Sequence, residues 1–580
     1  MSKLNVDQKS IFDLLSDRKN SFLIPDYQRP YEWSEEQCQT LWDDIFLFSF
    51  PDNDCDAFDE NEEYFLGSIV TFKNEESKLE VIDGQQRLTT ILLLLRAFYE
   101  KFGQMQDKNS KLAREMIEKC IWKTDAFGTA DKNILKIDSE VATDDDKSEF
   151  LNILKTGVVA SNNTSQYSKN FTFFNKKIQD FLNGFSSYFP YLPARILNNC
   201  ILLPIEAESQ NTALRIFSTL NDRGLPLSDA DIFKAQFYKF YKDINKKDEF
   251  IDAWKELEAL SALAFNSTSV TPMDELFTRY MYFLRALDGN KRTTTEALRK
   301  FFERNKYAYL KNVNTIKDLK KLALFWNRVN SQDQNYFDNK VLKKLFVLNF
   351  SPNGMWQNIL SVYFLKYSGE DEKLDQEKFF IFLESIIAFT FTYALTNPGL
   401  NSLRTPAYDE MVNIVTGKFS YFNKYKFEED ILRNLFDNYI FSNQRTITRS
   451  LLTWHAYSFD RQELIDRGCA LDIEHIYSKK RQEMEEGLSN YKNIDSLGNK
   501  ILLESSINIR ASDYRFEDKK AIYQGEVRRG KHKGESKIFE IKKIIEHDNF
   551  GEIEIIKRGK DIVNNFIEFV SDQNLLMRSN

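Results

Sequence analysis

Residues 471–476 read Leu-Asp-Ile-Glu-His-Ile. Apolar and polar residues alternate here, which predicts a strand over residues 470–476. Successive side chains of a strand point to opposite faces, so Glu474 and His475 can do different jobs. A carboxylate and an imidazole at one strand end can supply an oxygen ligand for a metal ion and a base that accepts a proton.

The segment that follows this strand contains two candidate partners for these side chains. A second strand is expected over residues 497–503, and its Asn499 can hold the imidazole in one orientation through a hydrogen bond. A helix is expected from about residue 506, and Asn508 in its first turn can provide a second metal ligand. Carboxylate and amide oxygens with retained waters suit Mg²⁺ or Mn²⁺. These groups together meet the needs of phosphodiester cleavage, which are a base, a divalent metal and an oriented imidazole.

A second motif lies near the N-terminus, where residues 79–88 read LEVIDGQQRL. The pattern predicts a strand over 79–82, a glycine turn and a helix over 88–101, a geometry that points free backbone N–H groups at an anion. Gly84 allows close approach of the backbone, and Arg87 can pair with phosphate oxygens. The alternative is an ordinary helix cap followed by a surface arginine.

Two further segments accompany this motif, FLIPDYQRPYEW at residues 22–33 and ALRIFSTLNDRGLPLSDADIFK at residues 213–234. With VIDGQQRLTT at residues 81–90 they resemble the N-terminal domain of the GmrSD family of modification-dependent (type IV) restriction enzymes. The resemblance implies a fold similar to ParB and sulfiredoxin, and the binding and hydrolysis of a nucleoside triphosphate. It places around the nucleotide phosphates Gln28, Arg29, Asp83, Gly84, Gln85, Gln86 and Arg87. It places in a second loop near the same cleft Asn221, Asp222, Arg223 and Asp231. The alternative for residues 221–224 is a simple turn.

The C-terminal segments resemble the His-Asn-His nuclease fold, in the form found at the C-terminus of GmrSD-type proteins. Asn499 and Asn508 lie nine positions apart, as in the family. Two positions depart from the family, because Ser478 and Lys500 stand where many members have Pro and Leu. The resemblance implies these roles: general base His475, orienting residue Asn499, metal ligands Glu474 and Asn508, and Asp472 as a carboxylate that supports the ligands.

Charge limits how this chain can meet nucleic acid. Its net charge is −8, so any contact with DNA must be local. A basic run begins downstream of the expected metal ligands, and it is either a contact with DNA phosphates or an exposed helix face. The DNA-contact candidates in this run are Lys519, Lys520, Arg528, Arg529, Lys531 and Lys533.

Composition sets the broad class of the protein. The 580 residues are 42% hydrophobic and 29% charged, which fits a soluble protein with more than one hydrophobic core. No apolar run is long enough to span a bilayer, the N-terminus has no signal-peptide core, and the five cysteines form no CxxC pair. We therefore expect a cytoplasmic protein with no membrane partner.

The expected fold is a multidomain α+β protein that is mainly helical. A ParB/sulfiredoxin-like nucleotide-binding domain is expected over residues 1–240, a helical middle region over 241–420, and a C-terminal ββα-metal (HNH) nuclease domain over 421–580. Residues 105–200 are expected to be mainly helical, with a strand over 199–205.

These expectations combine into one function and two alternatives. The function is an NTP-regulated DNA endonuclease of the type IV restriction type, dependent on Mg²⁺ or Mn²⁺, that cuts foreign or modified DNA in defence against phage. Its partners would be DNA and a nucleoside triphosphate, and a homo-oligomer is allowed. One alternative is a nucleotide-dependent DNA-binding or sensor protein with an inert nuclease, against which the intact ligand set argues. The other is a nicking or RNA-directed nuclease without modification specificity.

Overall fold

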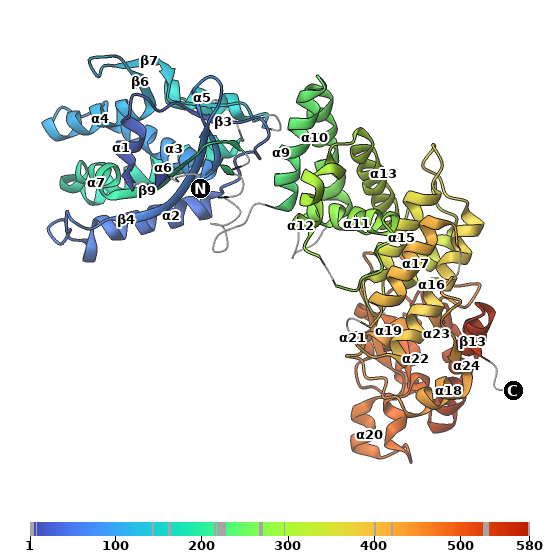
Figure 1. The fold of residues 1–580 in the computed structure, drawn as a ribbon. Coiled ribbons are helices and arrows are strands. Elements are labelled where there is room, and N and C mark those ends of the chain that lie inside the picture. The colour runs from blue at the N-terminus through green and yellow to red at the C-terminus, as the bar shows by residue number, and fades with distance from the viewer. Residues whose placement is uncertain are drawn as a thin grey trace. The chain divides into compact units, whose positions relative to one another are not determined.

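The structure is a computed structural model that divides into two compact units, residues 1–255 and 256–580. Figure 1 draws the chain as a ribbon coloured from blue at the N-terminus to red at the C-terminus. The three expected domains, 1–240, 241–420 and 421–580, stay a prediction. The structure describes residues 5–6, 8–141, 144–159, 164–210, 212–213, 216, 228–265, 271–294, 296–399, 402–418, 421–525 and 533–577.

A seven-stranded mixed sheet lies at the centre of the first unit. Its strands are β1 (Asn5–Val6), β2 (Lys9–Ser10), β3 (Phe22–Ile24), β4 (Tyr64–Lys73), β5 (Leu79–Asp83), β8 (Ile137–Ser139) and β9 (Cys200–Ala207). The order is β1-β9-β4-β5-β3-β8, and β2 also pairs with β9. β4 and β5 form an antiparallel pair, whereas β9 runs parallel to β4 and β3 runs parallel to β5. The strands predicted over 79–82 and 199–205 are therefore confirmed.

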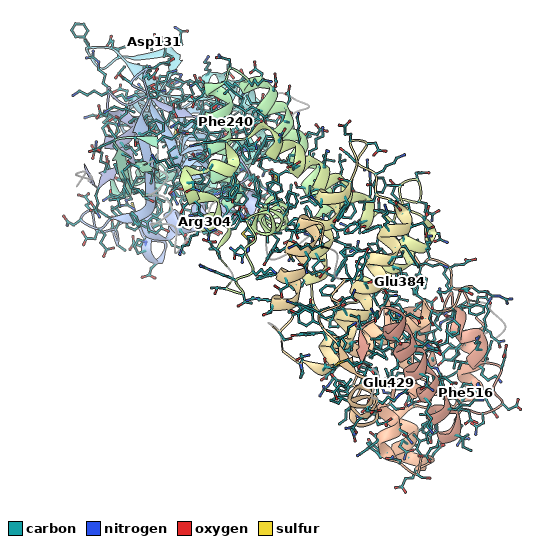
Figure 2. The ribbon with its side chains drawn as sticks, turned by 45° about the vertical axis from the view of Figure 1, so that its right-hand side comes forward. Asp131, Phe240, Arg304, Glu384, Glu429 and Phe516 are labelled. Atoms are coloured by element: carbon teal, nitrogen blue, oxygen red, sulfur yellow. The ribbon has the colours of Figure 1, made fainter. Side chains whose placement is uncertain are left out.

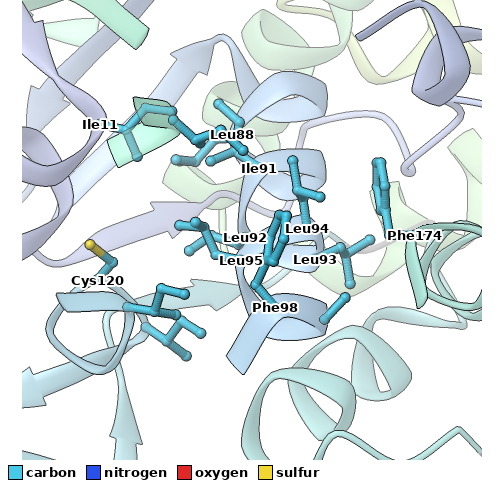
Figure 3. Close-up of a cluster of buried hydrophobic side chains, with 14 of the residues drawn as sticks. Ile11, Leu88, Ile91, Leu92, Leu93, Leu94, Leu95, Phe98, Cys120 and Phe174 are labelled. Atoms are coloured by element: carbon cyan, nitrogen blue, oxygen red, sulfur yellow. The ribbon is translucent and has the colours of Figure 1, made fainter. Parts of the chain in front are cut away.

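Helix α3 (Gln85–Phe102) forms the core of this unit. Every residue from Leu88 to Tyr99 is buried, because the apolar run Ile91–Leu95 leaves no polar face. Figure 3 shows Leu88, Ile91–Leu95 and Phe98 of this helix among Ile11, Cys120 and Phe174 from other elements. The helix predicted over 88–101 is confirmed. The other helices here are α1 (Ile11–Ser16), α2 (Glu35–Ser49), α4 (Lys108–Ile121), α5 (Lys147–Thr156), α6 (Gln166–Gly184), α7 (Tyr191–Asn199), α9 (Asp229–Asp243) and α10 (Lys247–Ala264), which continues into the second unit.

Residues 105–200 contain strands that the sequence pattern did not reveal. β6 (Trp122–Thr124) and β7 (Ala130–Leu135) form an antiparallel hairpin, and β8 extends the main sheet. Most of β7 is exposed, so it carries no alternation of buried and exposed residues that would mark a strand. The expectation of a mainly helical segment holds for the rest, which is α4 to α7.

The second unit begins with a helical region, as predicted. Its helices are α11 (Pro272–Leu287), α12 (Leu298–Glu303), α13 (Val313–Asn330), α14 (Asn339–Leu348), α15 (Met355–Tyr367), α16 (Gln376–Thr396), α17 (Arg404–Thr416), α18 (Glu429–Asn438) and α19 (Thr446–Ala456). Among the described helices, α16 is the one that is long and apolar enough to cross a membrane, and 67% of its apolar stretch is buried inside the protein. It packs against α14, α18 and α19, which is the position of a core helix.

A small strand–strand–helix unit follows this helical region. Strands β11 (Leu471–His475) and β12 (Lys500–Glu504) pair antiparallel, and α21 (Ser505–Ala511) packs on both. The predicted strands 470–476 and 497–503 are thus present, although residues 497–499 form the 3-10 turn η7 rather than the start of β12. Around them lie α20 (Lys479–Glu485), η6 (Tyr491–Asp495), α22 (Phe516–Tyr523), α23 (Phe539–Ile544), α24 (Glu552–Asp572) and a pair of short strands, β10 (Phe427–Glu428) and β13 (Leu576–Met577). Phe516, labelled in Figure 2, begins α22 and packs on Phe550 with ring centroids 5.5 Å apart.

Candidate active site

The register of β11 and β12 decides which side chains share a face. His475 lies opposite Lys500, and Glu474 lies opposite Ile501. Paired residues of an antiparallel ladder project to the same side. His475 and Lys500 therefore share one face, and Glu474 projects from the other.

The His475 imidazole is mostly buried, with 21% of its side chain exposed. Its Nε2 atom lies 3.7 Å from Oδ1 of Asp495 and makes no hydrogen bond within the described residues. Burial and the nearby Lys500 ammonium lower the pKa of His475 to about 4, although Asp495 opposes the shift. At neutral pH the imidazole is therefore uncharged and can accept a proton.

Glu474 projects into the protein, where it is part of a buried ion pair. Its Oε1 accepts hydrogen bonds from Nζ of Lys519 at 2.6 Å and from the hydroxyl of Tyr523 at 3.0 Å. Burial raises the pKa of Glu474, while Lys519 and Tyr523 act in the opposite direction. Lys519 is fully buried and also donates to the His475 carbonyl at 2.6 Å. In contrast to the prediction, Lys519 is a counter-ion inside the domain and is not free to contact DNA phosphates.

Asn499 fixes the backbone that follows His475 rather than the imidazole itself. Its Oδ1 accepts from the Tyr477 N–H at 2.7 Å, and its Nδ2 donates to the Tyr477 carbonyl at 3.0 Å and the Ile494 carbonyl at 3.1 Å. These bonds occupy both ends of the buried amide. The predicted direct hydrogen bond from Asn499 to the ring is absent, because the amide already pairs with both backbone groups of Tyr477.

The remaining candidate ligands suit a divalent metal only in part. Asn508 is half-buried on α21, and its side chain forms no hydrogen bond within the described residues. Asp472 lies 3.9 Å from Arg449. One carboxylate and one amide oxygen match the ligand preference of Mg²⁺, with waters completing the shell. No group of three or more His, Cys, Asp or Glu side chains gathers as a metal site in the described part of the chain.

The turn between β5 and α3 forms the second candidate site. Gly84 has a φ of 87°, and a Cβ there would lie 2.9 Å from the Ile69 side chain and 3.0 Å from the Ser68 carbonyl. Only glycine combines this backbone conformation with so close an approach. Among the described residues no side chain caps α3, which leaves the N–H groups of its first turn available to an anion.

Three glutamines of the predicted nucleotide site bond to the protein backbone. Gln85 and Gln86 donate to the carbonyls of Arg29 and Pro30, each at 2.9 Å. Gln28 donates to the carbonyls of Val81 and Ile82 at 3.2 and 3.1 Å. The two sequence segments predicted to meet, 22–33 and 79–88, are thus joined. The described contacts give the three amides a structural role and leave phosphate binding to other groups.

Charged side chains line the same turn. Arg87 donates to the Ser68 carbonyl at 2.8 Å, and Ser68 donates to Asp83 at 3.4 Å. Burial lowers the pKa of Arg87 and raises that of Asp83, and each charge opposes the shift of the other. Arg29 is about one-third exposed beside them and pairs with Glu32 at 3.3 Å. Two guanidinium groups and a free helix N-terminus make this turn a candidate for anionic ligands.

Two family models match the chain. The model of the GmrSD restriction endonuclease N-terminal domain matches residues 11–238, and the model of the C-terminal domain of GmrSD restriction endonucleases matches residues 422–565. The chain belongs to the GmrSD restriction endonuclease family. The resemblance of both ends to GmrSD proteins is confirmed. Among curated proteins, none matches the chain.

Membership of the GmrSD family gives the coarse function. The chain is a type IV restriction endonuclease, and DNA is its substrate. The turn at Gly84 lies within the GmrSD N-terminal match, and His475, Asn499 and Asn508 lie within the C-terminal match.

Several residues that were predicted to belong to the two sites of this GmrSD protein have other surroundings in the structure. Asp231 belongs to the capping box of α9: its Oδ2 accepts from the N–H of the N-cap residue Ser228 at 3.2 Å, and its own N–H donates to Ser228 Oγ at 3.2 Å. Lys520 donates to the His547 carbonyl at 2.7 Å, and Lys533 is exposed. The candidates outside the described residues are Asn221, Asp222, Arg223, Arg528, Arg529 and Lys531.

Sequence reasoning missed a buried arginine that supports the GmrSD C-terminal site. Nη1 of Arg558 on α24 donates to the carbonyls of Leu497, Gly498 and Lys500 at 3.0, 2.9 and 2.8 Å. Its Nη2 lies 2.7 Å from Oε1 of Glu540. Arg558 therefore holds the turn that presents Asn499. An arginine on an amphipathic helix looks solvated in sequence, so no local signal marked it.

Proposed function

We propose that this GmrSD protein is a divalent-metal-dependent DNA endonuclease of the His-Asn-His type, which cuts foreign or modified DNA in the cytoplasm in defence against phage. The observation that carries the proposal is the state of His475. It is an uncharged imidazole that is partly exposed at the end of β11, in a ββα arrangement. Such a group can take a proton from the water that attacks a phosphodiester.

The residues around His475 support this role through position. Asn499 fixes the backbone at Tyr477, and Arg558 fixes the turn that holds Asn499. A divalent metal would neutralise the charge that develops on the phosphate, and Glu474 and Asn508 are the residues that would hold it.

The N-terminal turn supports nucleotide binding. Free N–H groups at the start of α3, the glycine at position 84 and the guanidinium groups of Arg29 and Arg87 suit the phosphates of a nucleoside triphosphate. We propose that this domain binds and hydrolyses the nucleotide, and that the nucleotide state regulates cleavage.

A second candidate function has one observation in its favour. The buried ion pair between Glu474 and Lys519 already satisfies the carboxylate, so a metal ion must compete for it. In a nucleotide-dependent DNA-binding or sensor protein with an inert nuclease, no metal ion would displace Lys519 from Glu474.

A digestion panel separates the two functions. Unmodified, methylated, glucosylated and phosphorothioate DNA would each be incubated with wild-type protein and with His475→Ala, with and without Mg²⁺ and each nucleoside triphosphate. The endonuclease proposal expects Mg²⁺-dependent cutting of at least one DNA, reduced about 10² to 10⁴-fold in His475→Ala. DNA binding without cutting under every condition would support the inert sensor.

The basic run remains the proposed DNA contact, now without Lys519. Each phosphate contact contributes about one unit to the slope of log affinity against log salt. Replacing four residues with Gln should therefore flatten the slope by up to about four units, if all four bind. The four residues are Arg528, Arg529, Lys531 and Lys533. An unchanged slope would mean that DNA is held elsewhere.

A further inference from the structure

Lys500, opposite His475 in the ladder, is a lysine with no exposed surface. A buried ammonium is costly unless hydrogen-bond acceptors surround it. Its Nζ donates to Oδ1 of Asn443 at 2.6 Å and to Oδ1 of Asp495 at 2.8 Å. The strand thus holds an ammonium group, bonded to two acceptors, on the face that carries the imidazole.

Asp495 connects this charge to His475. It is the last residue of η6, its side chain is 35% exposed, and its Oδ1 lies between the Lys500 ammonium and Nε2 of His475. Burial works against ionisation of Asp495, but Lys500 and His475 together lower its pKa. A charged acceptor is therefore anchored 3.7 Å from the ring nitrogen.

The imidazole lacks any other orienting contact in the described part of the chain. Nε2 of His475 is buried without a hydrogen bond, and Asn499 is committed to Tyr477 and Ile494. A shift of less than an ångström would bring Nε2 within hydrogen-bond distance of Asp495 (roughly 3 Å).

We propose that Asp495, anchored by Lys500, is the positioning residue that orients His475 by accepting a hydrogen bond from Nε2–H. The inference rests on the proposed role of His475 as general base. A neutral imidazole carries one proton. With that proton on Nε2, the lone pair of Nδ1 is the base that accepts a proton from water. The resulting imidazolium is then stabilised by the Asp495 carboxylate, as in other His–Asp pairs.

Asp495→Asn tests the inference, since it keeps the shape and removes the charge. We expect kcat to fall about 10- to 100-fold with KM nearly unchanged, because only the charged intermediate loses its partner. Lys500→Met should give a smaller loss, because Asp495 stays charged but is no longer anchored. Asp561→Asn is the matched control, since this aspartate is exposed on α24 and its side chain makes no hydrogen bond or ion pair within the described residues.

A second readout is independent of activity. The chain has only four histidines, so ¹⁵N-labelled imidazoles can be assigned with His475→Gln. Wild-type His475 should show the Nε2–H tautomer, and Asp495→Asn should show a mixture of tautomers.

The outcomes separate this inference from the proposed function. Cutting by His475→Ala at the wild-type rate would overturn both. Loss of cutting in His475→Ala, together with a wild-type kcat in Asp495→Asn, would overturn only the role of Asp495. An Nδ1–H tautomer in the wild-type protein would overturn it without any substitution.

Discussion

At the scale of single residues, the ion pair between Lys519 and Glu474 determines what both side chains can do. Nζ and Oε1 lie 2.6 Å apart and are nearly excluded from solvent. Removing one partner of a buried pair leaves an uncompensated charge, which costs about 3–5 kcal/mol. We predict that Lys519→Met lowers the free energy of unfolding by about this amount in urea, and that Glu474→Gln in the same chain restores part of it. Lys520→Met, with its single bond to the His547 carbonyl, should cost less than about 1.5 kcal/mol. If Lys519→Met lost no more unfolding free energy than Lys520→Met, the structural role of Lys519 would be contradicted.

A second residue-scale prediction concerns acid stability. Burial alone would raise the pKa of Glu540, but Arg558 and His455 hold it at about 2, below the ordinary 4.5. A depressed carboxylate pKa stabilises the fold above the unfolded value, and this contribution is lost as pH falls toward the folded value. The free energy of unfolding of the wild type, relative to that of Glu540→Gln, should therefore fall by on the order of 3 kcal/mol between about pH 4.5 and pH 2. Urea unfolding of both proteins at several pH values measures this difference, and a constant difference would contradict it.

At the scale of elements, the contact of α24 with η7 depends on one glycine. A Cβ at Gly498 would lie 1.9 Å from the Ile555 carbonyl oxygen, so helix and turn would have to separate. We predict that Gly498→Ala costs at least about 2 kcal/mol of stability. It should also reduce DNA cutting, because the neighbouring Asn499 shifts. Gly534→Ala is the control, since a Cβ there meets nothing within 4 Å. Equal melting temperatures for the two variants would show that the contact adapts.

The same elements show how far sequence could predict this fold. The central helix α3 and its strand β5 follow from an apolar run and a glycine turn, both local signals. The turn η7 could not be predicted in this way, because Gly498 is required by its contact with a helix that lies more than fifty residues away in the chain. The strands β6 and β7 were not predicted, because β6 is too short to show an alternation of buried and exposed residues and β7 is largely exposed.

The candidate site was predictable in its residues more than in their contacts. His475 and Asn499 stand out because they lie on or beside two strands that the sequence pattern predicts and that pair in the structure. Whether the amide meets the ring or the backbone depends on the turn at Tyr477, which no spacing rule describes. Asp495 and Lys500 look like solvated charges in sequence, and only the structure shows that Lys500 is buried and lies 2.8 Å from Asp495.

At the scale of the whole molecule, the question is whether the two ends of the chain act together. The GmrSD matches lie in residues 11–238 and 422–565, so one chain contains both domains. If the bound nucleotide controls cutting, a substitution at the nucleotide turn must alter both nucleotide binding and DNA cutting, because coupling is a property of two sites. A substitution at the cutting site need alter only DNA cutting.

We predict that Arg87→Ala weakens nucleotide binding by about tenfold or more, because a charge-assisted contact to phosphate is worth about 1.5–3 kcal/mol. It should also remove the nucleotide-dependent part of DNA cutting. His475→Ala should abolish cutting and keep nucleotide affinity and hydrolysis, as measured by calorimetry and phosphate release. Arg18→Ala is the control, since this arginine is exposed in the same unit and its side chain makes no hydrogen bond or ion pair in the described part of the chain. Wild-type nucleotide affinity in Arg87→Ala would remove the turn from the nucleotide site. Lost affinity with undiminished cutting would instead show that the two sites work independently, because regulation by the nucleotide requires the cutting rate to follow its occupancy.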